Sequence, residues 1–157
     1  MDLNYTKLTE RYAEKLQGLW DDPDVIRYTN IKSPCDLTAI KMRIKRLAAF
    51  DTFSISIGDT LVGVVGCPCI DAQANAYGFF YQLKKAYWGK GIASVAAKWI
   101  IDYMKGKYVH PTFYADVVAN NIASERILVN LGFSCISQQI ASFEREGIQM
   151  DVHNYRL

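Results

Sequence analysis

The stretch from residue 81 to residue 93 reads Tyr81-Gln82-Leu83-Lys84-Lys85-Ala86-Tyr87-Trp88-Gly89-Lys90-Gly91-Ile92-Ala93. It lies between a predicted strand at Ala76 to Leu83 and a predicted amphipathic helix. Its two glycines let the backbone turn tightly and approach a ligand without a β-carbon in the way. The free N–H groups at the start of the next helix favour an anion, because the helix dipole is positive there. The segment therefore predicts a loop that holds a pyrophosphate without a cationic side chain.

Other phosphate-binding loops match this segment less well. The P-loop pattern Gly-x-x-x-x-Gly-Lys-Ser/Thr is absent. A dinucleotide fingerprint needs a third small residue, usually glycine, where Ser94 stands, and it should follow its strand closely. No convincing acidic residue for a ribose follows about twenty residues further on. A nucleotide-binding or oxidoreductase domain is therefore disfavoured, while a simple helix-entry turn stays open.

The residues before the loop predict two helices and an antiparallel run of strands. The first helix has an apolar stripe of Tyr12, Leu16, Leu19 and Trp20, and Asp21-Asp22-Pro23-Asp24 should end it. The second should begin at Ser33-Pro34, with Ser33 as its cap. Its apolar stripe is Leu37, Ile40, Ile44 and Leu47, and its solvated face carries Lys41, Arg43, Lys45 and Arg46. Strands are predicted at 53–57 and 61–65, joined by Gly58-Asp59.

The residues after the loop alternate between helices and strands. The predicted helix has one face of Ile92, Val95, Ala96, Trp99, Ile100 and Tyr103, and it should end near Gly106. A strand at 112–118, a helix at 122–131 and strands at 134–139 and 149–155 follow. This order predicts a mixed α/β sheet with helices on both faces, in one domain spanning residues 1–157.

Two motifs together resemble the GNAT superfamily of N-acetyltransferases. The stretch from Tyr81 to Ala93 looks like the family's motif A, whose core is Gln/Arg-x-x-Gly-x-Gly/Ala. The second motif is Asn121-Ile122-Ala123-Ser124, followed by Leu131-Gly132-Phe133. These motifs and the closing Tyr155-Arg156-Leu157 are similar to the branch that acetylates ribosomal-protein N-termini, the RimJ/RimL type. The resemblance implies a GNAT fold: an α+β, mostly antiparallel sheet of about six to seven strands, with central strands splayed for acyl-CoA.

The resemblance also implies acetyl-CoA as cosubstrate and no metal. The pantetheine arm would enter between the strands that end near Leu83 and Val118, and backbone groups near Leu83 would bond its amides. Asn121 and Ser124 resemble positions that contact the distal pantetheine and the thioester. The pyrophosphate would be held by the N–H groups of Trp88, Gly89, Lys90, Gly91, Ile92 and Ala93.

The chemistry implied is direct attack of an amine on the thioester. Ser124 is the candidate acid for the departing thiolate, with hydrogen bonding at the helix start as its equally open role. Glu144 and Asp116 are candidate bases, with a surface role as the default. The sequence departs from the family at Ala86, where Gln or Arg is usual, and at Leu128, where many members have a tyrosine that protonates the thiolate. These departures leave a non-catalytic acyl-CoA-binding regulatory module as the alternative.

The composition and charge of the chain indicate which kinds of partner are not expected. The net charge is only +2 and half of the 157 residues are apolar, so no direct DNA binding is expected. Cys67-Pro68-Cys69 has one intervening residue, whereas cysteine pairs that bind zinc usually have two, so no metal site is expected there. Neither His110 nor His153, which is on a predicted edge strand, is expected to be catalytic. The N-terminus has no secretory pattern, and the apolar stretch 61–70 is too short to span a membrane. We expect a cytoplasmic monomer or homodimer.

The acceptor is predicted to be a peptide α-amine or a small amine of modest pKa. An α-amine has a pKa near 8 and is partly neutral at pH 7, whereas a lysine amine near 10.4 needs a stronger base. Aromatic residues that could wall an acceptor pocket are Trp20, Tyr28, Phe79, Tyr81 and Tyr114.

Overall fold

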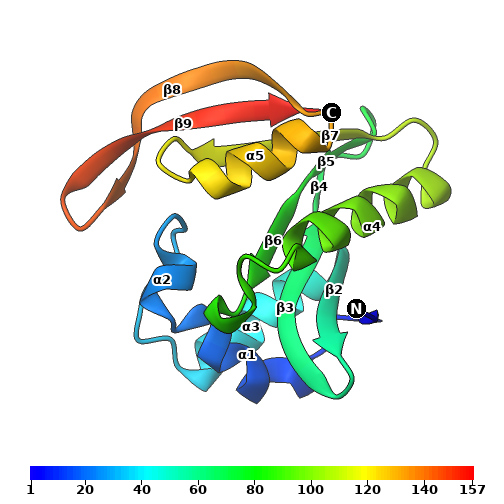
Figure 1. Cartoon of the computed structure of the whole chain (residues 1–157), viewed down its shortest axis with the longest axis vertical. Helices are drawn as coiled ribbons and strands as arrows, with labels where there is room; N and C mark the ends of the chain where they lie inside the picture. Colours follow the sequence, from blue (N-terminus) through cyan, green and yellow to red (C-terminus); the bar gives the residue numbers. More distant parts are fainter.

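The computed structural model describes residues 1–157 and contains two sheets (Figure 1). The four-stranded antiparallel sheet has the order β1 (Leu3–Lys7), β2 (Asp51–Ile57), β3 (Thr60–Cys67) and β6 (Phe80–Leu83). The five-stranded sheet has the order β4 (Cys69–Asp71), β5 (Ala76–Gly78), β7 (Thr112–Val118), β9 (Ile148–Arg156) and β8 (Ser134–Arg145). The α-helices are α1 (Ala13–Trp20), α2 (Pro23–Ile26), α3 (Leu37–Ala48), α4 (Ile92–Lys107) and α5 (Ile122–Asn130), with 3₁₀ turns η1 (Glu10–Tyr12) and η2 (Lys85–Tyr87).

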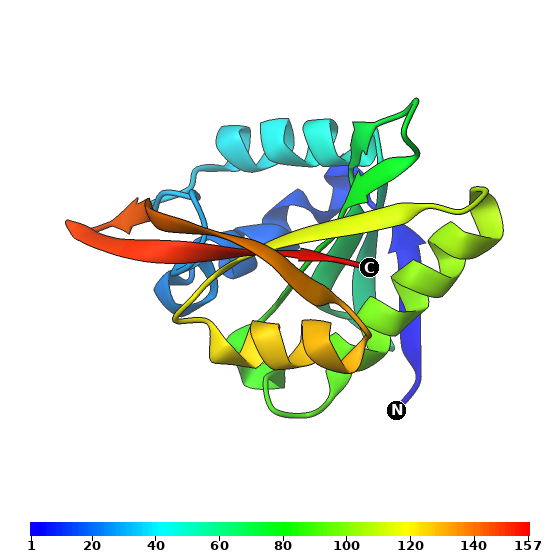
Figure 2. The same ribbon diagram turned by 90° about the horizontal axis from the view of Figure 1, so that it is seen from above.

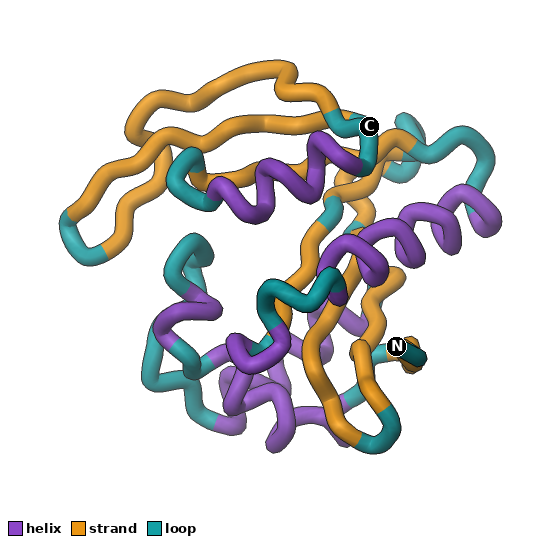
Figure 3. Tube along the Cα trace, viewed as in Figure 1, coloured by secondary structure: helices purple, strands orange, loops and turns teal.

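The strand predicted from Ala76 to Leu83 is divided between the two sheets. β5 pairs in parallel with β7 as far as Gly78↔Tyr114, and β6 then pairs only with β3. The side chains of Tyr77, Phe79 and Leu83 nevertheless all pack into the same core. The alternation of side chains continues unbroken from β5 into β6, so the sequence pattern predicts a single strand. Only the hydrogen-bond partners change between the two. Figure 3 shows β6 and β7 running in different directions.

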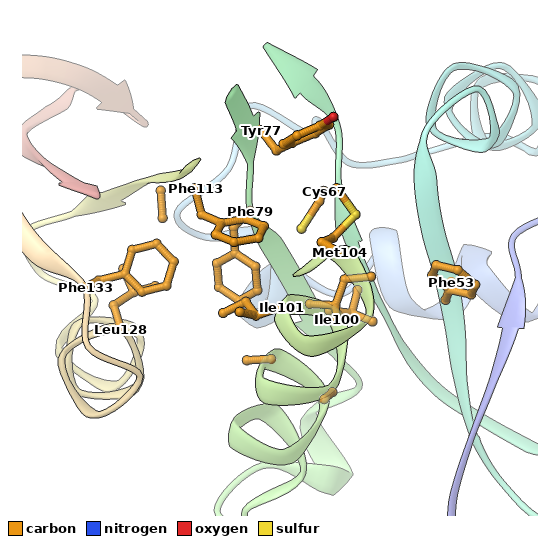
Figure 4. Packing of buried hydrophobic residues seen from close by; sticks show 14 of the residues in the cluster. Phe53, Cys67, Tyr77, Phe79, Ile100, Ile101, Met104, Phe113, Leu128 and Phe133 are labelled. Atoms are coloured by element: carbon orange, nitrogen blue, oxygen red, sulfur yellow. The ribbon is translucent and has the colours of Figure 1, made fainter. Parts of the chain in front are cut away.

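Helices cover both faces, as predicted. Helices α4 and α5 cover the larger core, which includes Phe79, Ile100 and Phe133, and the rings of Phe79 and Phe133 lie 5.7 Å apart (Figure 4). Helices α1 and α3 cover the smaller core on the other face, and Figure 2 shows α3 and α5 on opposite sides. Complete burial of a side chain such as Trp20 stabilises the fold by about 1.5–3 kcal/mol.

The first helix ends where predicted, and the second begins later than predicted. α1 ends at Trp20, directly before Asp21, and Asp22 then caps the short helix α2, accepting a hydrogen bond from the Asp24 N–H at 2.9 Å. Asp36, not Ser33, caps α3, accepting from the Ala39 N–H at 2.7 Å. Ser and Asp cap equally well, so local preference did not distinguish them.

Two further expectations differ from the structure. Val95, predicted on the buried face of α4, is 56% exposed, whereas the predicted end of this helix near Gly106 is confirmed, since α4 ends at Lys107. Strands β1 and β4 were not predicted. β9 lies between β7 and β8, so His153 is not on an edge strand. No helix has the length and apolarity needed to cross a membrane.

A buried carboxylate joins the end of α4 to the start of β2. The Asp51 carboxylate accepts hydrogen bonds from Lys107 Nζ and from the Tyr108 hydroxyl, each at 2.7 Å. Burial by itself would raise the pKa of Asp51, but these bonds outweigh it and hold the pKa below its usual value. This ion pair therefore stabilises the packing of α4.

Candidate active site

The two sheets diverge beside β6 and leave one of its edges unpaired. Lys84 N–H donates to the Val62 carbonyl at 2.9 Å, so this residue faces β3. By the alternation of an antiparallel ladder, the backbone N–H and C=O groups of Leu83 and Tyr81 then face away from β3, toward β7. No strand pairs with that edge of β6. We call this space, between β6 and the Val118 end of β7, the gap.

The glycine loop leads from the gap to the start of α4. Gly89 and Gly91 have φ values of 71° and 77°, in the left-handed region that favours glycine. Gly91 is the N-terminal cap residue of α4, and no side chain bonds the N–H groups of the first turn. The Trp88 indole, 45% exposed, donates to the Leu83 carbonyl at 2.9 Å. The N–H groups from Gly89 to Ala93 are therefore free beside the gap, as predicted. The Trp88 N–H is not, because it donates to the Lys85 carbonyl at 3.1 Å, and the Trp88 indole occupies one gap-facing carbonyl.

Tyr81 and Ser124 meet across the gap. The Tyr81 hydroxyl and Ser124 Oγ lie 2.9 Å apart, and the Ser124 N–H donates to Asn121 Oδ1 at 3.4 Å. Burial raises the pKa of Tyr81, although the bond to Ser124 acts in the opposite direction. The phenol is therefore protonated at neutral pH and can donate. Leu128 is buried in the core and adds no polar group (Figure 4).

Two cavities lie on the face of β6 that points away from the Tyr81 side chain. The first, which we call the Trp20 cavity, has a volume of about 320 Å³ and is lined by Trp20, Thr29, Asn30, Ile31, Arg43, Leu47, Phe80 and Gln82. The second, the Asp116 cavity, has a volume of about 260 Å³ and is lined by Pro68, Ile70, Gly78, Phe79, Phe80, Tyr114 and Asp116. Phe80 lines both, so they adjoin along one strand.

The sequence of residues 2–134 matches the family described as the acetyltransferase (GNAT) domain. The chain belongs to the GNAT acetyltransferase family. Its predicted activity as an N-acetyltransferase, its GNAT fold and its cosubstrate acetyl-CoA are thereby confirmed.

Other acetyltransferases are similar to this chain in sequence or in fold. The chain is 28% identical over 157 residues to the uncharacterized N-acetyltransferase p20 of Bacillus licheniformis, covering 95% of this chain and 83% of that protein. Its fold is similar to spermidine N-acetyltransferase from Vibrio cholerae, solved with CoA and spermine (TM-score 0.88, 16% identity, 99% and 94% of the two chains). It is also similar to ribosomal-protein-alanine N-acetyltransferase from Brucella melitensis (TM-score 0.83, 15% identity, 100% and 99% of the two chains). A third example is a protein from Salmonella typhimurium, solved with acetyl-CoA (TM-score 0.83, 14% identity, 100% and 94% of the two chains).

The three predicted catalytic residues lie at three different places in the acetyltransferase. Ser124 lies at the gap. Asp116 lines the Asp116 cavity, where its carboxylate accepts from Asn154 Nδ2 at 2.7 Å. Glu144 is exposed on the β8–β9 hairpin opposite Gln149 and lines neither cavity. No cluster of three or more metal-ligating side chains occurs in the acetyltransferase.

Of the aromatic residues predicted to wall an acceptor pocket, three line the cavities. Trp20 lines the Trp20 cavity, and Phe79 and Tyr114 line the Asp116 cavity. Tyr81 instead bonds Ser124, and Tyr28 donates from its hydroxyl to the Asn120 carbonyl at 3.4 Å.

Arg43 was expected on a solvated helix face, and this expectation was wrong. Its guanidinium lies over the Trp20 ring, 5.4 Å from the centroid, and lines the Trp20 cavity. Arg43 is one turn before Leu47 on α3 and therefore borders the apolar stripe, along which its stem packs. Phe80 and Gln82 were also missed, although their alternation with Tyr81 on β6 would have indicated the opposite face.

A second polar cluster holds α5 in place in the acetyltransferase. Glu125 Oε1 bonds His153 Nδ1 and accepts from the Tyr155 hydroxyl at 3.1 Å. Burial, together with the Glu125 carboxylate, raises the pKa of Tyr155 to about 12. Since Glu125 follows Ser124, these bonds to β9 position the start of α5 at the gap.

Proposed function

We propose that this acetyltransferase moves the acetyl group of acetyl-CoA to a primary amine of modest pKa, foremost a peptide α-amine, by direct attack on the thioester. The observation that carries the proposal is the unpaired edge of β6, which faces the hydroxyl pair of Tyr81 and Ser124 and leads to the free N–H groups of α4. Residues 1–157 would act as one catalytic domain.

In this proposal acetyl-CoA lies along the gap. The loop from Gly89 to Ala93 holds the pyrophosphate with its backbone N–H groups, where the helix dipole adds to the attraction, whereas the Trp88 N–H stays bonded to the Lys85 carbonyl. The gap-facing N–H and C=O groups of Leu83 bond the pantetheine amides, and Trp88 releases the Leu83 carbonyl when one of those amides takes its place. Asn121 and Ser124 then lie at the thioester end.

The transfer begins when a neutral amine attacks the thioester carbon. The carbonyl oxygen becomes negatively charged, and the gap-facing N–H of Tyr81 stabilises it. The C–S bond then breaks, and the amine nitrogen loses its proton to a base or water. The thiolate takes a proton from Ser124, which Tyr81 replaces through their shared hydrogen bond, and water then returns a proton to Tyr81, so the proton lost by the amine balances the one gained by the thiol. Burial raises the pKa of Tyr81 above the ordinary phenol value near 10, but a phenol is still closer to a thiol near 8.5 than an aliphatic alcohol is, and Leu128 supplies no such group.

Asp116 is the proposed base that takes the proton of the amine. Asp116 is the better placed of the two predicted carboxylates because it lines a cavity that shares Phe80 with the Trp20 cavity, and Glu144 remains the alternative. An amine with a pKa near 8 is partly neutral at pH 7 and needs little help from a base. This favours a peptide α-amine, as the resemblance to the RimJ/RimL branch does. A polyamine is the second candidate, suggested by the similar fold of the spermidine enzyme.

A CoA-release assay tests the acceptor. The protein and acetyl-CoA would be mixed with N-terminal peptides, polyamines or aminoglycosides at several pH values. We expect turnover of peptides, with a rate that rises through about pH 8, where half of the α-amine is neutral, and levels off about one pH unit higher. Turnover of polyamines alone would contradict the α-amine preference. No turnover at all, with acetyl-CoA still bound, would instead indicate the non-catalytic regulatory module.

Two substitutions test the proton source. Ser124→Ala and Tyr81→Phe should each lower kcat on the order of 100-fold and leave the KM for acetyl-CoA nearly unchanged. Ser134→Ala, which removes an exposed hydroxyl on β8, is the matched control. If both variants retain the wild-type kcat, the pair only holds α5 against β6.

A further inference from the structure

The polar side chains of the Trp20 cavity present mainly hydrogen-bond donors. Trp20 Nε1 donates to Gln82 Oε1 at 2.7 Å, so the amide oxygen of Gln82 is occupied and its NH₂ group is left for the cavity. The carbonyl oxygens of Thr29 and Ile31 accept from Arg145 Nη1 at 2.7 and 2.9 Å. No Asp or Glu lines the cavity. A polyamine would therefore find no carboxylate here.

Arg43 is the one charged residue that lines the Trp20 cavity, and no carboxylate neutralises it. None of the ion pairs in the structure involves Arg43. Burial, and next the nearby charge of Arg46, lower the pKa of the Arg43 guanidinium. A partly desolvated cation without a counter-ion is unfavourable, and a carboxylate or phosphate can form two parallel hydrogen bonds with a guanidinium. The cavity is therefore complementary to negative charge.

The Trp20 cavity lies directly behind the gap. Phe80 and Gln82 line it, while Tyr81 between them faces the other side and bonds Ser124. Neighbouring residues of a strand are about 3.3 Å apart, so the cavity floor adjoins the backbone at which the thioester would lie. We infer that the acceptor amine carries an anionic group, a carboxylate or a phosphate, which Arg43 binds while the amine reaches the gap. This inference rests on the proposed function and adds its substrate class.

Matched acceptor pairs test the inference by turnover. Ala-Asp has a side-chain carboxylate that Ala-Asn lacks, and alanine has an α-carboxylate that alaninamide lacks. O-phosphoethanolamine has a phosphate that ethanolamine lacks. We expect the anionic member of the productive pair to have a KM on the order of 10- to 100-fold lower. A nearby negative charge raises the pKa of an amine and makes it less reactive, so this preference must come from binding. Which pair shows it identifies the anion.

Substitutions connect the preference to one side chain. Arg43→Gln should remove the difference within the pair and leave the KM for acetyl-CoA unchanged. Lys45→Gln, which removes an exposed charge from the same helix, should keep the difference. Turnover with equal KM values in all three pairs would overturn the inference and leave the proposed function standing. Equal effects of the two substitutions would also overturn it.

A binding measurement makes the inference independent of turnover. With CoA in place of acetyl-CoA no acetyl group can move, and the indole N–H resonance of Trp20 reports on the cavity. The anionic member of a pair should shift this resonance in the wild type and in Lys45→Gln, but not in Arg43→Gln. Such a shift, together with no CoA release from acetyl-CoA in the turnover assay, would support the anion site and contradict the proposed function. Equal shifts by the neutral members would overturn the anion site.

Discussion

Gly91→Val separates the folding role of the glycine loop from its role in binding acetyl-CoA. Gly91 has a φ of +77°, and no atom outside its immediate chain neighbours lies within 4 Å of the position that a β-carbon would take. The protein around it can therefore accept a side chain, and the cost to folding is the left-handed backbone, about 1–2 kcal/mol. At 2–4 °C per kcal/mol, the melting temperature should fall by roughly 2–8 °C, and the domain should stay folded.

The effect on ligand binding should be much larger. Acetyl-CoA at about 100 times its Kd should stabilise the wild type by roughly 2.7 kcal/mol, whereas NAD should not stabilise it. The branched side chain of Gly91→Val would occupy the space through which the pyrophosphate reaches the N–H groups of α4. We therefore expect no shift of its melting temperature with acetyl-CoA in a thermal denaturation assay.

Gly58→Val provides the control. Gly58 lies in the β2–β3 turn with a φ of +55°, and it also has no neighbour within 4 Å of a β-carbon. It should lose similar stability and keep the full shift with acetyl-CoA. A folded Gly91→Val variant with wild-type affinity would show that the loop is only a turn. Stabilisation of the wild type by NAD and not by acetyl-CoA would refute the whole ligand assignment.

Two further predictions concern stability and the acceptor side. Asp51→Asn should lower the free energy of unfolding at pH 7 by about 1–3 kcal/mol, while Asp102→Asn, in an exposed pair, should change it little. Because the pKa of Asp51 is depressed, its contribution is present above about pH 4 and lost as the pH falls further; a difference in urea denaturation that persists at about pH 2 would contradict this. Arg145→Ala frees the carbonyls at 29 and 31 and should raise the KM for the acceptor severalfold without changing that for acetyl-CoA. Arg126→Ala, on exposed α5 surface, is its control, and equal KM values in both variants would exclude a role for the hairpin.

The sequence alone predicted the glycine loop, the strand–helix order after it and the residues Asn121 and Ser124 at the start of α5. These features are local: glycine conformation, the helix dipole and the 3.6-residue period act over a few neighbouring residues. The Asp36 cap shows the limit of local preference, because Ser33 suits a cap equally well and packing of the apolar stripe decides where α3 begins.

Only the tertiary structure decided which groups face one another in the site. Tyr81 meets Ser124 across 43 residues, and Trp20 meets Gln82 across 62. The division at Phe79 is invisible in the sequence because its side-chain alternation continues while the strand changes partners. Arg43 looked like a solvated charge because its helix position does not show that Trp20 lies beneath it and that no carboxylate lies near. Such contacts depend on distant segments meeting, which no local propensity encodes, and they determine which charges and hydrogen-bonding groups line the Trp20 cavity.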